Sequence, residues 1–258
     1  MAIQQSTDGL RELSLFSGSG GGILAGHLLG WRTICAVERD AYAAGILAQR
    51  QNDGCLKPFP IWSDVTTFDG RPWCGRVDVI SGGFPCQDLS IAGKGAGLEG
   101  EKSGLWREFK RIIGEVRPRE VFIENSPMLA VRGLHTILCD LASMGFNARW
   151  GCLSGYDTGH ETLGDRLWIV AKTALHGSQV LRTDQAANDY QAGPGQNANE
   201  LDAAGRRIER IEESLGERAI CGSADALAYK LDRFKAIGNG QDPFVAATAF
   251  KLLGGNDQ

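Results

Sequence analysis

The chain has 258 residues, of which 43% are hydrophobic and 22% are charged, and its formal net charge is −4. This composition is typical of a soluble globular protein with one large domain or one domain and a small appendage, and it argues against a strongly basic nucleic-acid-binding protein. No apolar run approaches the roughly 20 residues of a membrane span, and the first residues lack the charged and apolar blocks of a signal peptide, so we expect a cytoplasmic protein.

A glycine loop between two predicted strands is the first candidate ligand site. Residues 13–16 predict a strand, Gly18 to Gly22 a loop that leads into a helix, and residues 33–37 a second strand that ends at Glu38. Backbone N–H groups of such a loop can approach a ligand, and an acid at the end of the next strand can bind the two hydroxyls of a ribose. The spacing favours a nucleoside-cofactor site. The alternative is a glycine-rich turn with a solvated Glu38.

A second carboxylate follows a predicted helix at residues 41–51. Residues 60–66 predict a third strand that runs into a loop, with Asp64 near its end. A carboxylate at this place could bind the amino group of an adenine. Position alone favours a turn or cap role for Asp64, because aspartate side chains commonly accept hydrogen bonds from nearby backbone amides.

A cysteine lies just beyond the next predicted strand, residues 77–80. Gly82 and Gly83 mark the strand's end, and Pro85 fixes one backbone angle immediately before Cys86. Active sites of open α/β sheets lie beyond strand ends, so Cys86 is a candidate nucleophile. The alternative is a turn that contains one of seven cysteines. Their odd number and irregular spacing argue against a disulfide framework and a structural zinc site.

Glu124 ends a fifth predicted strand, residues 120–123, which follows a helix at 105–113. A carboxylate that ends an apolar strand before a proline turn is poorly placed for solvation, so we expect a raised pKa and a general-acid role. The alternative is a structural Glu124 that accepts hydrogen bonds from neighbouring backbone amides.

Strands and helices alternate as far as a predicted strand at 167–171, and this predicts an α/β fold with a doubly wound, mostly parallel sheet. Such a sheet brings Cys86, Glu124, Glu38 and the glycine loop to one edge. Residues 173–225 differ, because they contain five Arg and nine Asp or Glu, a balance of −4 that leaves the remainder neutral. We expect one domain of residues 1–172 plus 226–258 and a small acidic region at 173–225. Pro243 is well placed to start a last helix.

Taken together, these motifs resemble the DNA (cytosine-5)-methyltransferases, in particular the short bacterial and phage type. The resemblance covers residues 11–172 and about 229–250. The matching segments are Phe16-Ser17-Gly18-Ser19-Gly20, the Pro85-Cys86-Gln87 loop that extends to Ser90, the Glu124-Asn125 pair, Arg166 before a strand, and Gly238-Asn239.

The resemblance implies the Rossmann-like fold of S-adenosylmethionine-dependent methyltransferases and a covalent mechanism on a flipped cytosine. Cys86 would add to carbon 6 of the ring, Glu124 would protonate ring N3, and Arg166 would bond to the base carbonyl or to the loop. Pro85, Gln87, Ser90 and Asn125 belong to the loop and pair that shape the substrate site. No metal is implied.

The implied cofactor is S-adenosylmethionine. The family's pattern distributes its contacts over Phe16, Ser17, Gly18 and Gly20 at the glycine loop, Glu38 at the ribose, Asp64 at the adenine amino group and Asn239 at the methionine end. The implied partner is double-stranded DNA, bound by a monomer, with a cognate restriction endonuclease as a candidate second partner.

Two features depart from the family's pattern. Gly164 replaces the first arginine of a Gln-x-Arg-x-Arg element, which removes one anchor next to Arg166. The target-recognition region implied at 173–225 is short and acidic, so it should bind phosphates weakly. Two alternatives therefore stay open: methylation of cytosine in transfer RNA, although that branch's Cys-Phe-Thr element is missing, and a DNA-binding relative with impaired catalysis.

Overall fold

The computed structural model describes residues 9–85, 104–158, 164–173 and 240–254. Several predicted site residues lie outside this part of the chain: Cys86, Gln87, Ser90 and Asn239. The acidic region predicted at 173–225 lies outside it as well, apart from its first residue.

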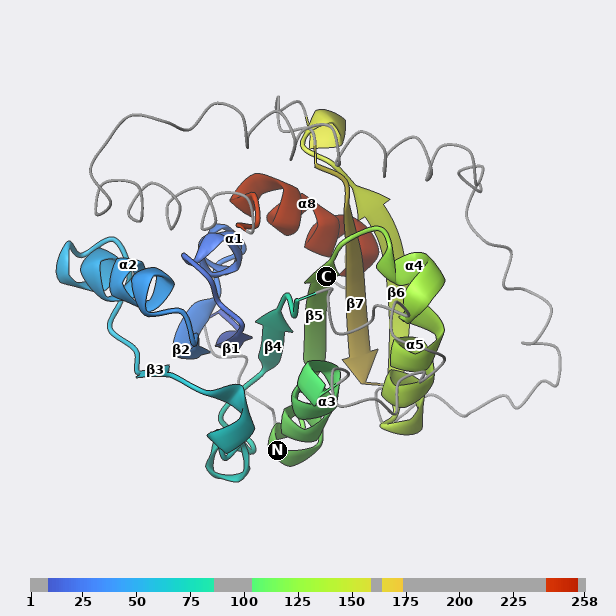
Figure 1. The fold of residues 1–258 in the computed structure, drawn as a ribbon, viewed down its shortest axis with the longest axis horizontal. Helices are drawn as coiled ribbons and strands as arrows, with labels where there is room; N and C mark the ends of the chain where they lie inside the picture. The colour runs from blue at the N-terminus through green and yellow to red at the C-terminus, as the bar shows by residue number, and fades with distance from the viewer. Residues whose placement is uncertain (1–8, 86–103, 159–163, 174–239, 255–258) are drawn as a thin grey trace, which may run out of the picture. The chain divides into compact units, whose positions relative to one another are not determined.

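A single sheet of seven strands forms the centre of the described fold, in the order β3-β2-β1-β4-β5-β7-β6 (Figure 1). The strands are β1 (Arg11–Leu15), β2 (Arg32–Val37), β3 (Ile61–Trp62), β4 (Val79–Gly82), β5 (Glu120–Asn125), β6 (Phe146–Leu153) and β7 (Arg166–Thr173). The pairs from β3 to β5 are parallel, whereas β7 is antiparallel to both β5 and β6. The prediction of a doubly wound, mostly parallel α/β sheet is therefore confirmed.

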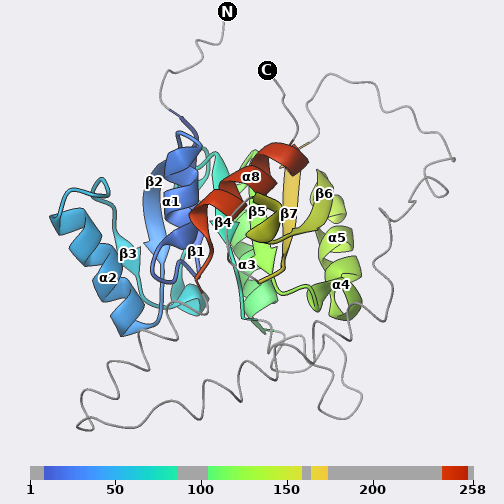
Figure 2. The ribbon, with the colours of Figure 1, turned by 90° about the horizontal axis from the view of Figure 1, so that it is seen from above.

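Helices cover both faces of the sheet, as the view from above shows (Figure 2). One face carries α1 (Gly21–Leu28), α2 (Ala41–Asn52) and α8 (Pro243–Gly254), and the other carries α3 (Gly104–Val116), α4 (Leu129–Arg132) and α5 (Leu134–Ser143). None of the described helices is long and apolar enough to cross a membrane.

The alternation of side chains along β1 assigns residues to these two layers. Leu13 and Leu15 are fully buried and belong to the same cluster as Phe109 of α3. Glu12 and Ser14 point to the opposite face, because successive side chains of a strand alternate, and Glu12 lies against Gly26 of α1. The strand thus places an apolar surface on one side and two polar side chains beneath α1.

Most predicted elements are present, and the differences are local. The third strand extends only over Ile61–Trp62, because Asp64 starts a 3₁₀ turn at Val65–Thr67 instead of continuing the strand. Phe16, predicted as the last residue of the first strand, follows β1 with a φ of 52°, which an extended strand does not allow. Pro243 is the first residue of α8, as predicted.

Candidate active site

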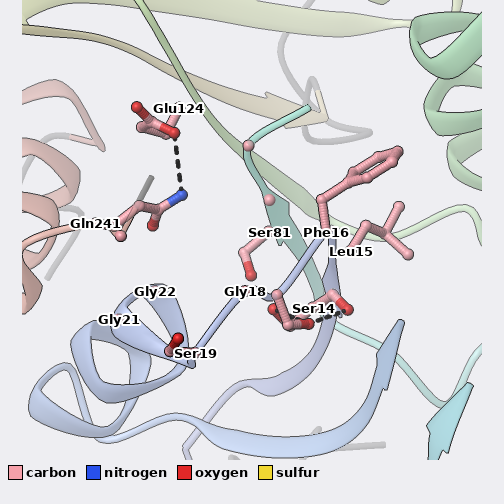
Figure 3. Close-up of a pocket in the computed structure, with 14 residues that line it drawn as sticks. Ser14, Leu15, Phe16, Gly18, Ser19, Gly21, Gly22, Ser81, Glu124 and Gln241 are labelled. Carbon is pink, nitrogen blue, oxygen red and sulfur yellow. Dashed lines mark hydrogen bonds between the residues drawn. The ribbon is translucent and has the colours of Figure 1, made fainter. Parts of the chain in front are cut away.

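A pocket lies at the carboxyl ends of the neighbouring strands β1, β4 and β5. Its lining comes from residues 14–19 and 21–22, residues 81–83, Glu124, and residues 240–241 before α8 (Figure 3). Parallel strands present their carboxyl ends at one edge of a sheet, where α/β proteins bind ligands. The glycine loop and Glu124 therefore meet at this edge, as the sequence predicts.

The glycine loop turns sharply after β1. Gly18 and Gly20 have φ values of 52° and 89°, in the left-handed region that favours glycine. The hydroxyl of Ser17 donates to the carbonyl of Ser14 at 3.0 Å, and the backbone N–H of Ser17 donates to the carbonyl of Val37 at 3.1 Å. These bonds hold the loop against β2 and leave the first turn of α1 facing the pocket.

Glu38 fixes the same loop from the end of β2. Its carboxylate accepts hydrogen bonds from the N–H of Gly18 at 2.6 Å and from the N–H of Asp40 at 2.7 Å. Arg50 of α2 adds a bond from Nη1 to the carbonyl of Ser19 at 2.6 Å. The structure thus brings Glu38 to the glycine loop, while its role at a ribose stays a prediction.

The described residues around the pocket fit a polar ligand such as the cofactor that the sequence implies. Ser19 lines the pocket, and its hydroxyl oxygen is buried without a hydrogen-bond partner among the described residues. An unsatisfied buried hydroxyl costs free energy, so a polar ligand group at this place would be stabilising. Among the described residues, no atom lies within 4 Å of the place where a Cβ of Gly18 would be, which leaves room over the loop in this part of the structure.

Asp64 acts as a cap. Its Oδ1 accepts hydrogen bonds from the N–H and the hydroxyl of Thr66, at 2.9 and 2.8 Å. The backbone bond, followed by the hydroxyl bond, lowers the pKa of Asp64. Asp64 does not line the pocket. The cap interpretation of Asp64 is therefore correct for this structure, and its contact with an adenine stays a prediction.

The chain that leads to Cys86 is packed tightly up to its last described residues. Phe84 is 3% exposed and packs against the rings of Trp106 and Phe109. Pro85, the next residue, is exposed. Glycine at position 82 allows the end of β4 to pass close to the end of β1, because a Cβ on Gly82 would lie 2.2 Å from the carbonyl oxygen of Leu15. Cys86 follows directly, outside the described residues.

Glu124 lies between two partners at the pocket. Its Oε1 is 3.0 Å from Nε of Arg166, and its Oε2 accepts a hydrogen bond from Nε2 of Gln241 at 3.4 Å. Only 13% of the Glu124 side chain is exposed. Burial raises the pKa of Glu124, and the positive charge of Arg166 and then the Gln241 amide offset part of that rise. The direction of this pKa change is the one expected from the sequence.

Sequence reasoning missed two polar residues near the pocket, Gln241 and Glu12. Gln241 contacts Glu124 only because the segment before α8 folds back onto β5. Glu12 is fully buried behind the pocket and accepts hydrogen bonds from the hydroxyls of Ser81 and Thr33, both at 2.6 Å. Ser81 also lines the pocket. An acidic residue inside an apolar strand was the available hint for Glu12.

Comparisons with known proteins give the family of this chain's relatives. A family model described as C-5 cytosine-specific DNA methylase matches residues 10–214. The Type II methyltransferase M.Eco47II of Escherichia coli is 34% identical over 142 residues, which cover 52% of this chain and 32% of that protein. The Type II methyltransferase M.NgoFVII of Neisseria gonorrhoeae is 25% identical over 246 residues, 93% of this chain and 63% of that protein. The chain thus spans between about a third and just under two thirds of these relatives' lengths.

Solved structures share the fold. The S. pombe Dnmt2 methyltransferase superposes with a TM-score of 0.54 at 21% identity, covering 66% of this chain and 53% of that one. A putative DNA modification methyltransferase encoded within an E. coli prophage superposes with a TM-score of 0.51 at 24% identity, covering 64% and 47% of the two chains. At these identities the likeness shows the architecture alone.

Proposed function

This chain belongs to the C-5 cytosine-specific DNA methylase family, and we propose that it transfers a methyl group from S-adenosylmethionine to carbon 5 of a cytosine in double-stranded DNA. The observation that carries the proposal is the placement of Glu124. This largely buried carboxyl group lies at the pocket opposite the glycine loop. It is beside Gly83, which precedes Cys86 by three residues in the chain.

Carbon 5 of cytosine is too electron-poor to attack a methyl donor by itself. In the proposed reaction the thiolate of Cys86 forms a bond to carbon 6, and the displaced π electrons make carbon 5 nucleophilic. A bound methyl donor would supply its methyl group to carbon 5, with loss of the bond between methyl and sulfur. Transfer of the carbon 5 proton to solvent would then restore the ring's double bond and expel Cys86 as a thiolate.

Glu124 stabilises the charge that this addition places on the base. Electron density moves toward ring N3, and the burial that raises the pKa of Glu124 favours the protonated form that can donate there. Arg166 holds Oε1 of the same group at 3.0 Å, which fixes the direction in which Glu124 faces the base. Arg166 acts here through Glu124, with its contact to the base carbonyl as the further proposed role.

S-adenosylmethionine supplies an electrophilic methyl group when it is bound. We assign its binding to the glycine loop, with Phe16 and the backbone of 17–20 around it. The hydroxyl of Ser19, which has no hydrogen-bond partner in the described part of the chain, would be a polar contact. The proposed contacts of Glu38, Asp64 and Asn239 with ribose, adenine and methionine belong to the same assignment.

The proposal extends to the organisation of the chain. In this proposal, residues 1–172 plus 226–258 form the catalytic domain and residues 173–225 read the DNA. The target base flips out of the stack, because the active site cannot reach a stacked base. The protein acts as a soluble monomer in the cytoplasm, and a restriction endonuclease of matching specificity is its candidate partner.

Covalent trapping tests this proposal. DNA that contains 5-fluorocytosine cannot lose its carbon 5 substituent after methyl transfer, so the enzyme should remain attached through Cys86. We expect an adduct with wild-type protein and S-adenosylmethionine, and none with Cys86→Ala. Cys55→Ala, which changes an exposed cysteine, is the matched control and should still be trapped. An adduct of undiminished yield with Cys86→Ala would contradict the proposed mechanism.

A further inference from the structure

The segment before α8 places the side chain of Gln241 in the pocket, between the glycine loop and Glu124. A Cβ added to Gly21 would lie only 2.1 Å from the backbone carbonyl oxygen of Gln241. A Cβ added to Gly22 would lie 2.6 Å from the side-chain Oε1 of the same residue. On the other side, Nε2 of Gln241 would be 3.1 Å from a Cβ of Gly83. Three glycines therefore make room for this one residue, and Figure 3 shows its amide pointing at Glu124.

The two oxygens of Glu124 have partners of different kinds. Arg166 approaches Oε1 with a permanent positive charge at 3.0 Å, and Gln241 donates to Oε2 with a neutral amide at 3.4 Å. A guanidinium group can only donate hydrogen bonds, whereas an amide has a donor end and an acceptor end. Oε2, which faces Gln241, can therefore carry a proton and donate it to the acceptor end of the amide. Oε1 faces Arg166, which has no acceptor for such a proton.

We propose that Gln241 is a positioning residue that holds Oε2 of Glu124 in both protonation states of the carboxyl group, an inference that rests on the proposed function. Its Nε2–H group donates to the carboxylate. When Glu124 carries a proton, a half turn of the amide presents Oε1 as the acceptor. The half turn itself changes no covalent bond. When the O–H group of Glu124 turns from Gln241 to N3 and its proton is transferred, the O–H bond breaks and Nε2–H of Gln241 again donates to the carboxylate that remains.

The side chain and the backbone of Gln241 have separable roles. The backbone packs against Gly21 of α1 and precedes Pro243, the first residue of α8. The side chain reaches Glu124. Gln241→Met keeps the length of the side chain and the backbone while it removes both polar atoms, and Gln241→Glu keeps the shape while it places a negative charge beside Glu124. Gln49→Met on the exposed side of α2 is the matched control.

The test measures activation of the base without the cofactor. Addition of Cys86 to carbon 6 makes the carbon 5 hydrogen exchangeable, so tritium release from DNA with 5-tritiated cytosine reports on Cys86 and Glu124 alone. We expect Gln241→Met to slow the release about tenfold, the effect of losing one hydrogen bond to a charged group. The decline of the rate at high pH should move to higher pH, because the hydrogen bond that Gln241 donates to the ionised carboxylate is stronger than the one it accepts from the neutral acid, so that its loss disfavours ionisation.

Gln241→Glu should move the pH at which the rate declines still higher, since a like charge disfavours ionisation of Glu124. Binding of S-adenosylmethionine, measured by calorimetry, should change by less than about threefold in both variants, well under the tenfold that about 1.4 kcal/mol represents. A Gln241→Met protein that melts like the wild type and shows its unaltered rate and pH profile would overturn this inference alone. A wild-type protein that neither releases tritium nor transfers methyl groups would overturn the proposed function as well.

Discussion

Asn125, the last residue of β5, donates a hydrogen bond from Nδ2 to the carbonyl oxygen of Phe84, 2.9 Å away. Both residues are 3% exposed. The bond joins the end of β5 to the chain that leaves β4, so the segment that enters the Cys86 loop is fixed relative to Glu124. A nucleophile and an acid that act on one base need such a fixed separation, because small misplacements of reacting groups are costly in rate.

Asn125→Ala should therefore lower both stability and activity. The substitution leaves the buried carbonyl of Phe84 without its partner, which costs about 1–3 kcal/mol. Urea unfolding measures this loss, and single-turnover methyl transfer measures the effect on rate, which we expect to exceed the effect on cofactor binding. Asn147→Ala, at an exposed position of β6, is the control. Equal stability of the two variants would show that the bond to Phe84 contributes nothing.

Activity should decline as pH rises through the raised pKa of Glu124. Burial holds this carboxyl group in its protonated form to a higher pH than an exposed glutamate, and the proposed step requires the proton. Glu124→Gln should lower kcat by a factor of about 10² to 10⁴, the usual contribution of a general acid, and should abolish the decline. The measurement is kcat against pH for both proteins with saturating DNA and cofactor. A decline of the same midpoint in Glu124→Gln would assign it to another group.

Stability should fall as pH rises because of Glu12. Burial raises the pKa of this fully buried carboxyl group from 4.5 to about 7, and the hydroxyls of Ser81 and Thr33 offset part of the rise. The folded protein thus binds a proton that the unfolded chain has lost between these two pH values, so the free energy of unfolding decreases across that window. One pKa unit corresponds to about 1.4 kcal/mol, so the decrease amounts to about 3 kcal/mol by pH 8.

The test compares wild type with Glu12→Gln by urea unfolding at pH 5 and pH 8. The variant has no carboxyl group to titrate at this position, so its stability should change less over this range and should exceed that of the wild type at the higher pH. An identical loss of stability in both proteins would mean that other groups cause it.

Gly83→Ala should remove activity while the fold persists. A Cβ at this position would lie 2.3 Å from Oε2 of Glu124 and 3.1 Å from Nε2 of Gln241, so the carboxyl group must move. A Cβ at Gly45 in α2 meets no atom of the described residues within 4 Å, so Gly45→Ala should stabilise the protein by about 0.5–1 kcal/mol, as expected for a helix interior. Methyl-transfer assays and thermal melting check the pair. Full activity of Gly83→Ala would contradict the close approach seen at Glu124.

Sequence patterns were sufficient where a signal is local. The short apolar strands, the glycine loop and the acids at their ends predicted the sheet and the edge where Glu38 and Glu124 lie. They favoured a cap role for Asp64 but could not predict that the third strand would end at Trp62, because adjacent residues allow both a strand and a cap. The contact of Gln241 with Glu124 was also out of reach, since it depends on how α8 packs against the sheet and not on any neighbour in sequence.

The direction of β7 illustrates the same limit. Its apolar run predicted a strand but not its direction, and β7 pairs antiparallel with both β5 and β6. This pairing sets Asn125 opposite Leu167 and thereby brings Arg166, the residue before Leu167, to Glu124. A parallel strand at this place would have put Arg166 at the opposite edge of the sheet.

Methyl transfer to DNA tests the central claim most directly. Protein with S-adenosylmethionine labelled in its methyl group is incubated at low salt with mixed-sequence double-stranded DNA, and in parallel with RNA, and the modified bases are mapped at single-base resolution. The account predicts label at carbon 5 of cytosines within a short repeated DNA sequence, and none with Cys86→Ala. Label confined to RNA, or label in DNA that persists with Cys86→Ala, would contradict it.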